Sequence, residues 1–509
     1  MEAFAAAIAR ARVPAVQNDT SPAQAGEMVA RAHGASSAWR DLSPRQRAEV
    51  LTRAAAAMRS RRDELSGIMI KEAGKTWREA DADVCEAIDF CEFYARLAIP
   101  MFDRQRLGRF IGELDEQWYQ PRGVAVVISP WNFPVAICCG MTVAALVTGN
   151  PTIVKPAEQT PGIARVMVEI LHDSMREAGI EPGLARDVLH VCPAPGETTG
   201  AALVRDPRVA LVAFTGSRDV GLDILNAAAP MSPFAPNLDR AAFEAFVRGE
   251  HAHVKRVICE MGGKNAIIID TSADLDEAVL GGRHSAFGFQ GQKCSAASRV
   301  IVVDPAGEDG PAIRTFIRRF VEATRALTIG DPMLPGTDVG PVIDAESQAR
   351  IRRFIEIGSR ESTLELAMEA SPGLEAATGR RYVGPHIFSR VKPEHTIARE
   401  EIFGPVAAVL HARDFDTALA IANASPYKLT GGVFSRKPSH LERAKREFRV
   451  GNLYLNRGIT GALVARQPFG GFGMSGVGSK AGGLDYLLQF VEPRASCENT
   501  LRRGFAPEL

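Results

Sequence analysis

The sequence lacks any stretch long and apolar enough to cross a membrane. Its longest nearly apolar run, Val135 to Val147, is interrupted by Gly140 and Thr142 and falls short of the roughly 20 residues that a membrane helix needs. The opening MEAFAAAIARAR contains an acidic residue and no long apolar segment, so we expect no secretory signal. Lysine plus arginine equals aspartate plus glutamate at 60 each, so no global charge favours nucleic acid or an anionic membrane as a partner.

Cysteine is also scarce, with eight in 509 residues, and no two form a CxxC pair. This usage predicts no disulfide framework and favours a reducing, cytoplasmic location. No group of histidine, cysteine and aspartate has the spacing of metal ligands, so we expect no metal. The remaining composition, 46% apolar and 24% charged, is that of a globular chain long enough for two or more domains.

The residue pattern predicts an α/β fold. Ser43, Pro44 and Gln46 form a helix-start signal, and a second helical stretch runs from about Trp77 to Ala95. Apolar runs then predict buried strands that alternate with helices, as in a doubly wound nucleotide-binding domain; the strands are expected at 123–128, 152–155, 188–191 and 209–214. A second α/β unit is expected after Glu260, with strands at 266–269 and 299–303 and a helix at 275–287.

Cys294 is the strongest single candidate for chemistry. It lies in FGFQGQKCSAASR, among small and polar residues with Lys293 beside it, whereas core cysteines normally have large apolar neighbours. A thiol becomes a nucleophile with the help of a base, and Glu260, at the end of an apolar run and before a Gly-Gly turn, is a carboxylate that folding could bring to it. The alternative is that Cys294 is an ordinary small apolar residue, but its local sequence argues against that.

Signals for a phosphate-bearing ligand are weaker. The GxGxxG fingerprint is missing, and the strand ending at Phe214 is followed by Gly216, Ser217 and Gly221, which suit a pyrophosphate or simply a turn. Lys155 and Glu158 follow another strand, where an acid can accept hydrogen bonds from ribose hydroxyls or form a solvated ion pair.

From about Ala30 to Val491 the chain resembles the aldehyde dehydrogenase family, through PWNFP, KPAEQTP, FTGSRDVG, EMGGKN, FGFQGQKCSA, EEIFGPV and QPFGGFGMSG, in that order. The resemblance implies that Cys294 attacks the aldehyde, that Glu260 activates water for deacylation, and that Asn132 belongs to the oxyanion hole. It also implies that NAD is bound in preference to NADP. The residues matching the cofactor contacts are Ser129, Pro130, Trp131, Lys155, Glu158, Gly216, Ser217, Glu401 and Phe403.

Within that family the chain is most similar to the branch that oxidises L-glutamate γ-semialdehyde, including the dehydrogenase part of bifunctional proline-utilisation enzymes. FQGQKCSA, GNLYLNRGITGALV and SKAGGLDYL carry this likeness. It implies that Ser295 and the Gly461-Ala462 backbone hold a carboxylate, that Phe133 and Phe469 pack on the aliphatic chain, and that Glu86 lies near the amino end. The full set of implied substrate residues is Glu86, Phe133, Lys293, Ser295, Gly461, Ala462 and Phe469.

The resemblance also implies a domain plan and partners. We expect an NAD-binding domain (1–104 and 123–258), a catalytic domain (259–450), a return segment lining the site (451–485) and a small oligomerisation arm (105–122 and 486–509). A homo-oligomer and a functional partnership with a proline dehydrogenase are expected, and the 226–255 segment is longer than the family's usual connection. Two alternatives stay open: a dehydrogenase for another semialdehyde, such as succinate semialdehyde, and a non-catalytic scaffold with the same fold.

Overall fold

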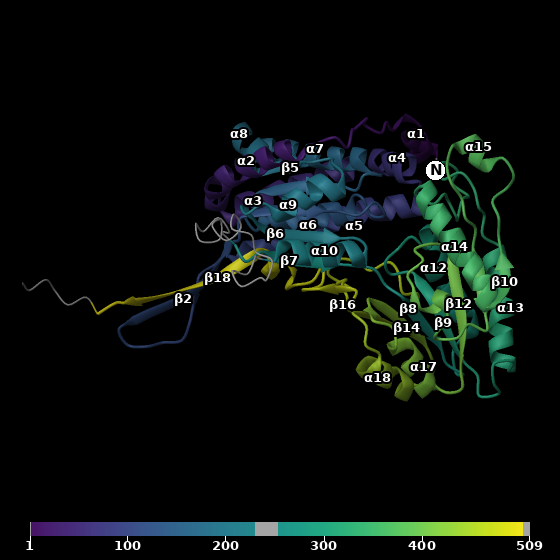
Figure 1. Cartoon of the computed structure of the whole chain (residues 1–509). Helices are drawn as coiled ribbons and strands as arrows, with labels where there is room; N and C mark the ends of the chain where they lie inside the picture. The colour runs from purple at the N-terminus through teal and green to yellow at the C-terminus, as the bar shows by residue number, and fades with distance from the viewer. Residues whose placement is uncertain (1, 230–252, 502–509) are drawn as a thin grey trace, which may run out of the picture.

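The computed structural model describes residues 2–229 and 253–501. Two sheets, each covered by helices, lie beside each other, and a long ribbon of strands extends away from them (Figure 1). Most of the long 226–255 connection falls outside the described residues. Within the described ranges, no helix is long and apolar enough to cross a membrane.

The first sheet has six strands in the order β17-β7-β6-β3-β4-β5, all parallel except β17. Its inner strands are continuous buried runs, as the apolar sequence predicted. The strands are β3 (Val124–Ile128), β4 (Thr152–Lys155), β5 (Leu189–Val191), β6 (Val209–Thr215), β7 (Arg256–Glu260) and β17 (Gly476–Val477). The helices that connect them are α6 (Ala136–Val147), α7 (Pro161–Glu177), α8 (Pro182–Val188), η1 (Gly196–Gly200), α9 (Ala201–Arg205) and α10 (Arg218–Ala228).

Five helices precede this sheet: α1 (Glu2–Arg10), α2 (Pro22–Asp41), α3 (Pro44–Ser60), α4 (Arg62–Ala73) and α5 (Trp77–Met101). The helix start expected at Ser43 is confirmed, because the Ser43 hydroxyl accepts from the Gln46 amide and the Gln46 side chain accepts from the Ser43 amide. The expected second helix is also confirmed, and as α5 it extends beyond Ala95 to Met101. One face of α5 packs against α3 and α6 and so adjoins the first sheet.

The second sheet confirms the expected second α/β unit. It has seven strands in the order β10-β11-β12-β9-β8-β14-β15, parallel except for β10. The strands are β8 (Asn265–Ile269), β9 (Ala297–Val303), β10 (Thr363–Ala367), β11 (His386–Ser389), β12 (Val406–Ala412), β14 (Thr430–Phe434) and β15 (Asn452–Leu455). The accompanying helices are α12 (Leu275–Phe287), η2 (Gly288–Gly291), α13 (Pro311–Arg325), α14 (Ala345–Glu361), α15 (Leu374–Thr378), α16 (Thr396–Arg399), α17 (Phe415–Asn423) and α18 (Pro438–Glu447).

The chain crosses between the two sheets twice. Strand β7 of the first sheet runs into β8 of the second through only Met261–Lys264, so the carboxyl end of one meets the amino end of the other. After β15 the chain returns through β16 (Phe472–Gly473), which pairs with β13 (Tyr427–Lys428), and then adds β17 to the edge of β7. The return segment therefore lies at the junction of the sheets.

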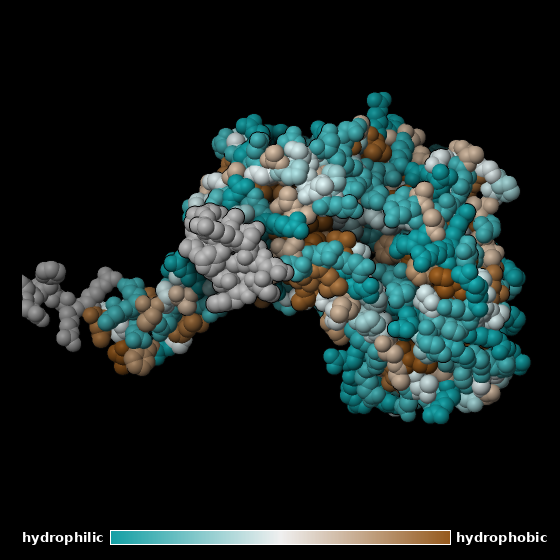
Figure 2. Space-filling view, viewed as in Figure 1, coloured by the Kyte–Doolittle hydropathy of each residue, from teal (hydrophilic) through white to brown (hydrophobic). Residues whose placement is uncertain are grey.

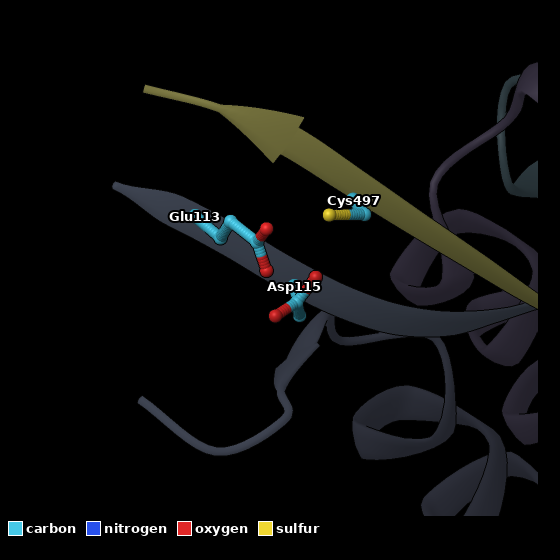
Figure 3. Close-up of side chains that lie close together, drawn as sticks. All are labelled: Glu113, Asp115 and Cys497. Carbon is cyan, nitrogen blue, oxygen red and sulfur yellow. The ribbon is translucent and has the colours of Figure 1, made fainter. Parts of the chain in front are cut away.

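The ribbon consists of β1 (Gln105–Arg106), β2 (Glu113–Pro121) and β18 (Val491–Asn499), the last following η3 (Tyr486–Phe490). It projects from the body, and its tip carries the exposed apolar residues Phe110 and Ile111 (Figure 2). Glu113, Asp115 and Cys497 gather on it with ligand atoms within 4.8 Å of one another (Figure 3). Exposed acidic groups often come together without an ion, so this cluster alone assigns no metal site. The predicted domain boundaries, including the oligomerisation role of this arm, stay predictions.

Candidate active site

Cys294 lies at the junction of the two sheets, in the loop between η2 and β9. Its backbone path is unusual, because Phe289 and Gln290 have positive φ angles of 48° and 55° and Gly291 follows at 66°. A Cβ on Gly291 would come within 2.3 Å of the Gly404 carbonyl oxygen, so only glycine fits there. The loop is thus bent sharply to bring Cys294, which is partly exposed, to the open junction.

The carboxamide of Asn265, at the start of β8, holds this bend. Its nitrogen donates to the carbonyl oxygens of Cys294 at 2.7 Å and Ala296 at 2.9 Å, and its oxygen accepts from the Thr430 amide at 2.9 Å. The nucleophile loop is thereby fixed to two neighbouring strands, β8 and β14. Sequence reasoning missed Asn265, although EMGGKN contains it, because its partners lie far along the chain.

Asn132, the expected oxyanion donor, is buried beside the same loop. Its Nδ2 donates to the Gln292 carbonyl oxygen at 3.0 Å, which leaves the second N–H of the amide for another acceptor. Burial, together with the nearby carboxyls of Glu401 and Glu260, raises the pKa of the Cys294 thiol to about 12. The thiol is therefore protonated in the empty protein and needs a proton acceptor to become a nucleophile.

Glu260, at the end of β7, is 8% exposed and faces the return segment. The Gly471 amide donates to its Oε2 at 3.4 Å, and a Cβ on Gly470 would come within 2.7 Å of its Oε1. Burial raises the pKa of Glu260 to about 8, opposed by that amide and by the ammonium of Lys480. A carboxyl of this pKa takes up and releases protons near neutral pH, as a general base must.

A cavity of about 1240 Å³ runs along the carboxyl ends of the first sheet and reaches Cys294 and Asn132. All of the predicted cofactor residues line it: Ser129, Pro130, Trp131, Lys155, Glu158, Gly216, Ser217, Glu401 and Phe403. None of the predicted substrate residues does, and neither does Glu260. The structure thus brings the predicted cofactor set together on one side of Cys294.

The groups in this cavity fit a dinucleotide. Glu158 Oε1 accepts from Lys155 Nζ at 3.1 Å and from the Gly196 amide at 2.8 Å, which aims a half-exposed carboxylate at the cavity. Ser217 caps α10, whose first amides offer donors for an anion. At the other end, the ring of Trp131 stands edge-on to Phe403, with 5.6 Å between centroids.

Glu401 lies between that end of the cavity and Cys294. Its Oε1 accepts from the Gly263 amide at 2.9 Å, and a Cβ on Gly262 would come within 2.0 Å of its other oxygen, so the Gly-Gly turn lets the carboxyl approach the backbone. Burial raises its pKa. Sequence reasoning also missed Gly196, His253 and Arg350, which line the cavity but belong to no motif that it used.

The predicted substrate residues come from three parts of the chain: Glu86 from α5, Phe133, Lys293 and Ser295 from positions next to Asn132 or Cys294, and Gly461, Ala462 and Phe469 from the return segment. Their role in binding substrate stays a prediction. Phe133 directly follows Asn132, and the Phe469 backbone pairs with Ala481 at 2.8 Å in both directions. Ser295 is buried, and its carbonyl oxygen accepts from the Thr430 hydroxyl at 3.2 Å. Lys293 turns toward α5, where its ammonium pairs with Glu79 at 2.7 Å, so its charge is already matched and it secures the nucleophile loop.

The comparisons with known proteins agree with this geometry. The aldehyde dehydrogenase family model matches residues 9–495. This chain belongs to the aldehyde dehydrogenase family. A 1-pyrroline-5-carboxylate dehydrogenase of Geobacillus thermodenitrificans is 46% identical over 445 residues, which are 87% of this chain and 79% of that protein.

Two solved structures share the fold. The 1-pyrroline-5-carboxylate dehydrogenase from Thermus with bound NAD matches with a TM-score of 0.84 and 43% identity, covering 94% of this chain and 86% of that one. Proline utilization A from Bdellovibrio bacteriovorus matches with a TM-score of 0.85 and 44% identity. That match covers 96% of this chain but 47% of the longer one, so this aldehyde dehydrogenase spans about half of that protein.

Replacing the nucleophile should stop turnover. We expect Cys294→Ala to lower aldehyde oxidation on the order of 10⁴-fold or more, because no other group can form the thioester. Cofactor binding and thermal unfolding should change little, since the polar contact that alanine gives up is a hydrogen bond from the Ser295 backbone amide to the sulfur. Cys497→Ser, which alters an exposed cysteine on the ribbon, is the control and should keep full activity. Turnover by Cys294→Ala comparable to the wild type would reject the assignment.

The raised pKa of Glu260 predicts a pH dependence. The carboxylate form that can take a proton from water predominates only above pH about 8, so steady-state turnover should rise with pH between roughly 7 and 9. Glu260→Gln should retain a first burst of NADH, lose steady turnover and lose this rise. If the burst disappears as well, Glu260 acts earlier, in activating the thiol.

Proposed function

We propose that this protein oxidises L-glutamate γ-semialdehyde to L-glutamate with NAD, the second step of proline degradation. The open-chain aldehyde forms from 1-pyrroline-5-carboxylate by hydrolysis. The proposal identifies a zwitterionic substrate, with a carboxylate at one end, an ammonium beside it and the aldehyde at the other end. The relatives named above act as 1-pyrroline-5-carboxylate dehydrogenases and support this choice.

The observation that carries the proposal is an imbalance of charge on α5, among one buried and two partly buried acids. Glu79, Asp83 and Glu86 follow one another at helical spacing and so share one face. Burial raises the pKa of Glu79, but the ammonium groups of Lys293 and Lys75 outweigh this and lower it. Asp83 pairs with Lys75 at 2.9 Å. Three carboxyl groups are therefore met by two ammonium groups.

Among the described residues, Glu86 is the carboxyl of this cluster that forms no ion pair with a lysine or arginine. Burial, together with the Asp83 charge and against the partial opposition of Lys75 and Lys293, raises its pKa to about 8. His284, close to Lys293 and Glu79, does not restore the balance, because burial lowers its pKa and leaves it neutral near pH 7. A substrate ammonium would supply the missing charge. Succinate semialdehyde has no such group, which disfavours that alternative.

The other end of the substrate would meet the loop around Gly461. This residue has φ +74°, and a Cβ built on it would find no atom within 4 Å, so the loop is a glycine turn with an open side. Backbone amides of Gly461 and Ala462, with the Ser295 hydroxyl, are donors of the kind that a carboxylate accepts. The rings of Phe133 and Phe469, both half-buried, would pack on the methylene groups between the two ends.

The residues of the site divide the reaction into two halves. The Cys294 sulfur attacks the aldehyde carbon as its proton passes, through water, to the carbonyl oxygen, and that oxygen takes hydrogen bonds from Asn132 Nδ2 and the Cys294 amide. NAD, when bound, supplies the acceptor for the hydride that converts this adduct to a thioester. Glu260 then takes a proton from the water that attacks the thioester, which releases the acid and returns the thiol. This complete set of groups argues against a non-catalytic scaffold.

Two statements about assembly belong to the proposal. The likeness to half of a proline utilization A chain supports functional coupling to a proline dehydrogenase, carried on the same chain or on another one. The projecting ribbon with exposed apolar residues at its tip supports a homo-oligomer, because such a surface is usually covered by another subunit.

The amino group of the substrate should matter as much as its carboxylate. We expect kcat/KM for L-glutamate γ-semialdehyde to exceed that for 5-oxopentanoate, which lacks only the amino group, by roughly 10- to 100-fold, since one charge-assisted bond contributes about 1.5–3 kcal/mol. Pentanal, lacking both charges, should be worse again. Glu86→Gln should reduce this ratio of kcat/KM between L-glutamate γ-semialdehyde and 5-oxopentanoate. Glu92→Gln is the control and should leave the ratio unchanged, because Glu92 is a partly exposed acid of the same helix that pairs with Arg59 and Arg96. Equal rates for the first two aldehydes would contradict the proposal.

NAD should be preferred over NADP. The Glu158 carboxylate, aimed at the cavity by Lys155 and Gly196, would repel a 2′-phosphate. Glu158→Gln should therefore raise kcat/KM with NADP and lower it with NAD, while Glu169→Gln, a surface acid on α7, should change neither. Wild-type kcat/KM values that are equal for the two cofactors would reject this account of the ribose end.

A further inference from the structure

Lys75 is a fully buried lysine that belongs to none of the predicted site residues. It follows Gly74, the left-handed residue that ends α4, and its side chain points to the core between α5 and the PWNFP segment. Its ammonium donates to Asp83 Oδ2 at 2.9 Å and to the Asn132 carbonyl oxygen at 2.7 Å. It also lies 4.1 Å from the centroid of the Phe133 ring.

Asp83 holds the same segment at a second point. While its Oδ2 pairs with Lys75, its Oδ1 accepts from the Ala136 amide at 2.6 Å, at the first residue of α6. The five residues from Asn132 to Ala136 are therefore tied at both ends to one buried ion pair. Asn132 is the first residue of this fixed segment, and Phe133 lies between its two fixed ends.

The buried ion pair of Lys75 and Asp83 is not explained by a contribution to stability alone. Removing two charges from water costs several kcal/mol per ion, and a pair of apolar side chains often stabilises a core as well or better. What the pair provides is directional contact with the Asn132 carbonyl, the Ala136 amide and the Phe133 ring, and the ammonium also lies 4.6 Å from the centroid of the Phe289 ring. The carbonyl, the amide and the Phe133 ring belong to the short segment that contains Asn132, the proposed oxyanion donor.

We propose that Lys75, supported by Asp83, is a positioning residue that holds the Asn132 carboxamide, and with it the Phe133 ring, in place beside Cys294. Lys75 does not touch the reacting atoms. It acts by fixing the Asn132 carbonyl, so that the side-chain amide, already anchored on one side by the Gln292 carbonyl oxygen, keeps its free N–H directed at the aldehyde oxygen. This inference deepens the proposed function and rests on it for the role of Asn132.

The test is a double-mutant cycle on the first chemical half of the reaction. NADH formation is measured in single turnovers, with enzyme in excess over aldehyde, for the wild type, Lys75→Met, Asn132→Ala and the double variant. We expect Lys75→Met to slow this step by roughly 10- to 100-fold while cofactor affinity stays within about twofold. In the Asn132→Ala background the same change should slow it by less than about threefold, because two residues that act through one group do not add.

Lys71→Met is the matched control. The Lys71 ammonium also donates to two carbonyl oxygens, those of Ala9 at 2.9 Å and Ala11 at 2.7 Å, but away from the site, so this variant should react like the wild type. If Lys75→Met fails to fold, Asp83→Asn replaces it in the cycle, because asparagine keeps the oxygen for the Ala136 amide and removes the charge that holds Lys75. The proposal would be overturned if Lys75→Met, or Asp83→Asn in its place, slowed the reaction by the same factor in the wild type and in the Asn132→Ala variant.

The cycle is run with both L-glutamate γ-semialdehyde and propanal. The two aldehydes distinguish a failure of the proposed substrate from a failure of the proposed positioning role. A wild-type enzyme that shows no preference between these aldehydes would contradict the proposed substrate but would still react through Cys294 and Asn132. The coupling between Lys75 and Asn132 is then measured with propanal. Loss of coupling with both aldehydes contradicts the positioning role alone.

Discussion

The buried charges on one face of α5 control most of what surrounds Cys294. Lys293 reaches Glu79 from the nucleophile loop, and Lys75 reaches Asp83 from the end of α4 while holding the Asn132 carbonyl. Each contact thus ties a catalytic segment to the same helix. Burial, with a smaller contribution from the Asp83 charge, raises the pKa of Glu86 to about 8, so this carboxyl is protonated near neutral pH in the empty protein. In the proposed function, the ammonium group of the substrate completes this cluster.

The junction of the sheets imposes a second constraint, since it brings Cys294, the cofactor cavity and Glu260 together. The cofactor cavity approaches Cys294 from the carboxyl ends of the first sheet, whereas Glu260 faces the return segment and lies outside that cavity. The burial of Glu260 at this junction also raises its pKa, so the same packing that positions the carboxyl makes it able to accept a proton near neutral pH.

Sequence reasoning was most reliable where the signal was local. Continuous apolar runs located β3, β4 and β6, and the helix expected at 275–287 is α12 with those bounds. The family motifs also identified the cofactor residues, all of which line one cavity. Lys75 and Asn265 were missed because a lysine after a helix and an asparagine in a turn look ordinary, and their importance comes from carbonyls supplied by distant segments. The partner of Lys293 was missed for the same reason, since Glu79 lies more than 200 residues away.

The central claim is that a substrate ammonium completes the α5 cluster and ionises Glu86. Calorimetric titration of the enzyme at pH 7 with L-glutamate and with glutarate, each in two buffers of different ionisation enthalpy, tests it directly. Because the pKa of Glu86 is about 8 in the empty site, binding L-glutamate should release roughly one proton more per site than binding glutarate, and Glu86→Gln should abolish this difference. The same proton exchange for both ligands in the wild-type enzyme would contradict the account.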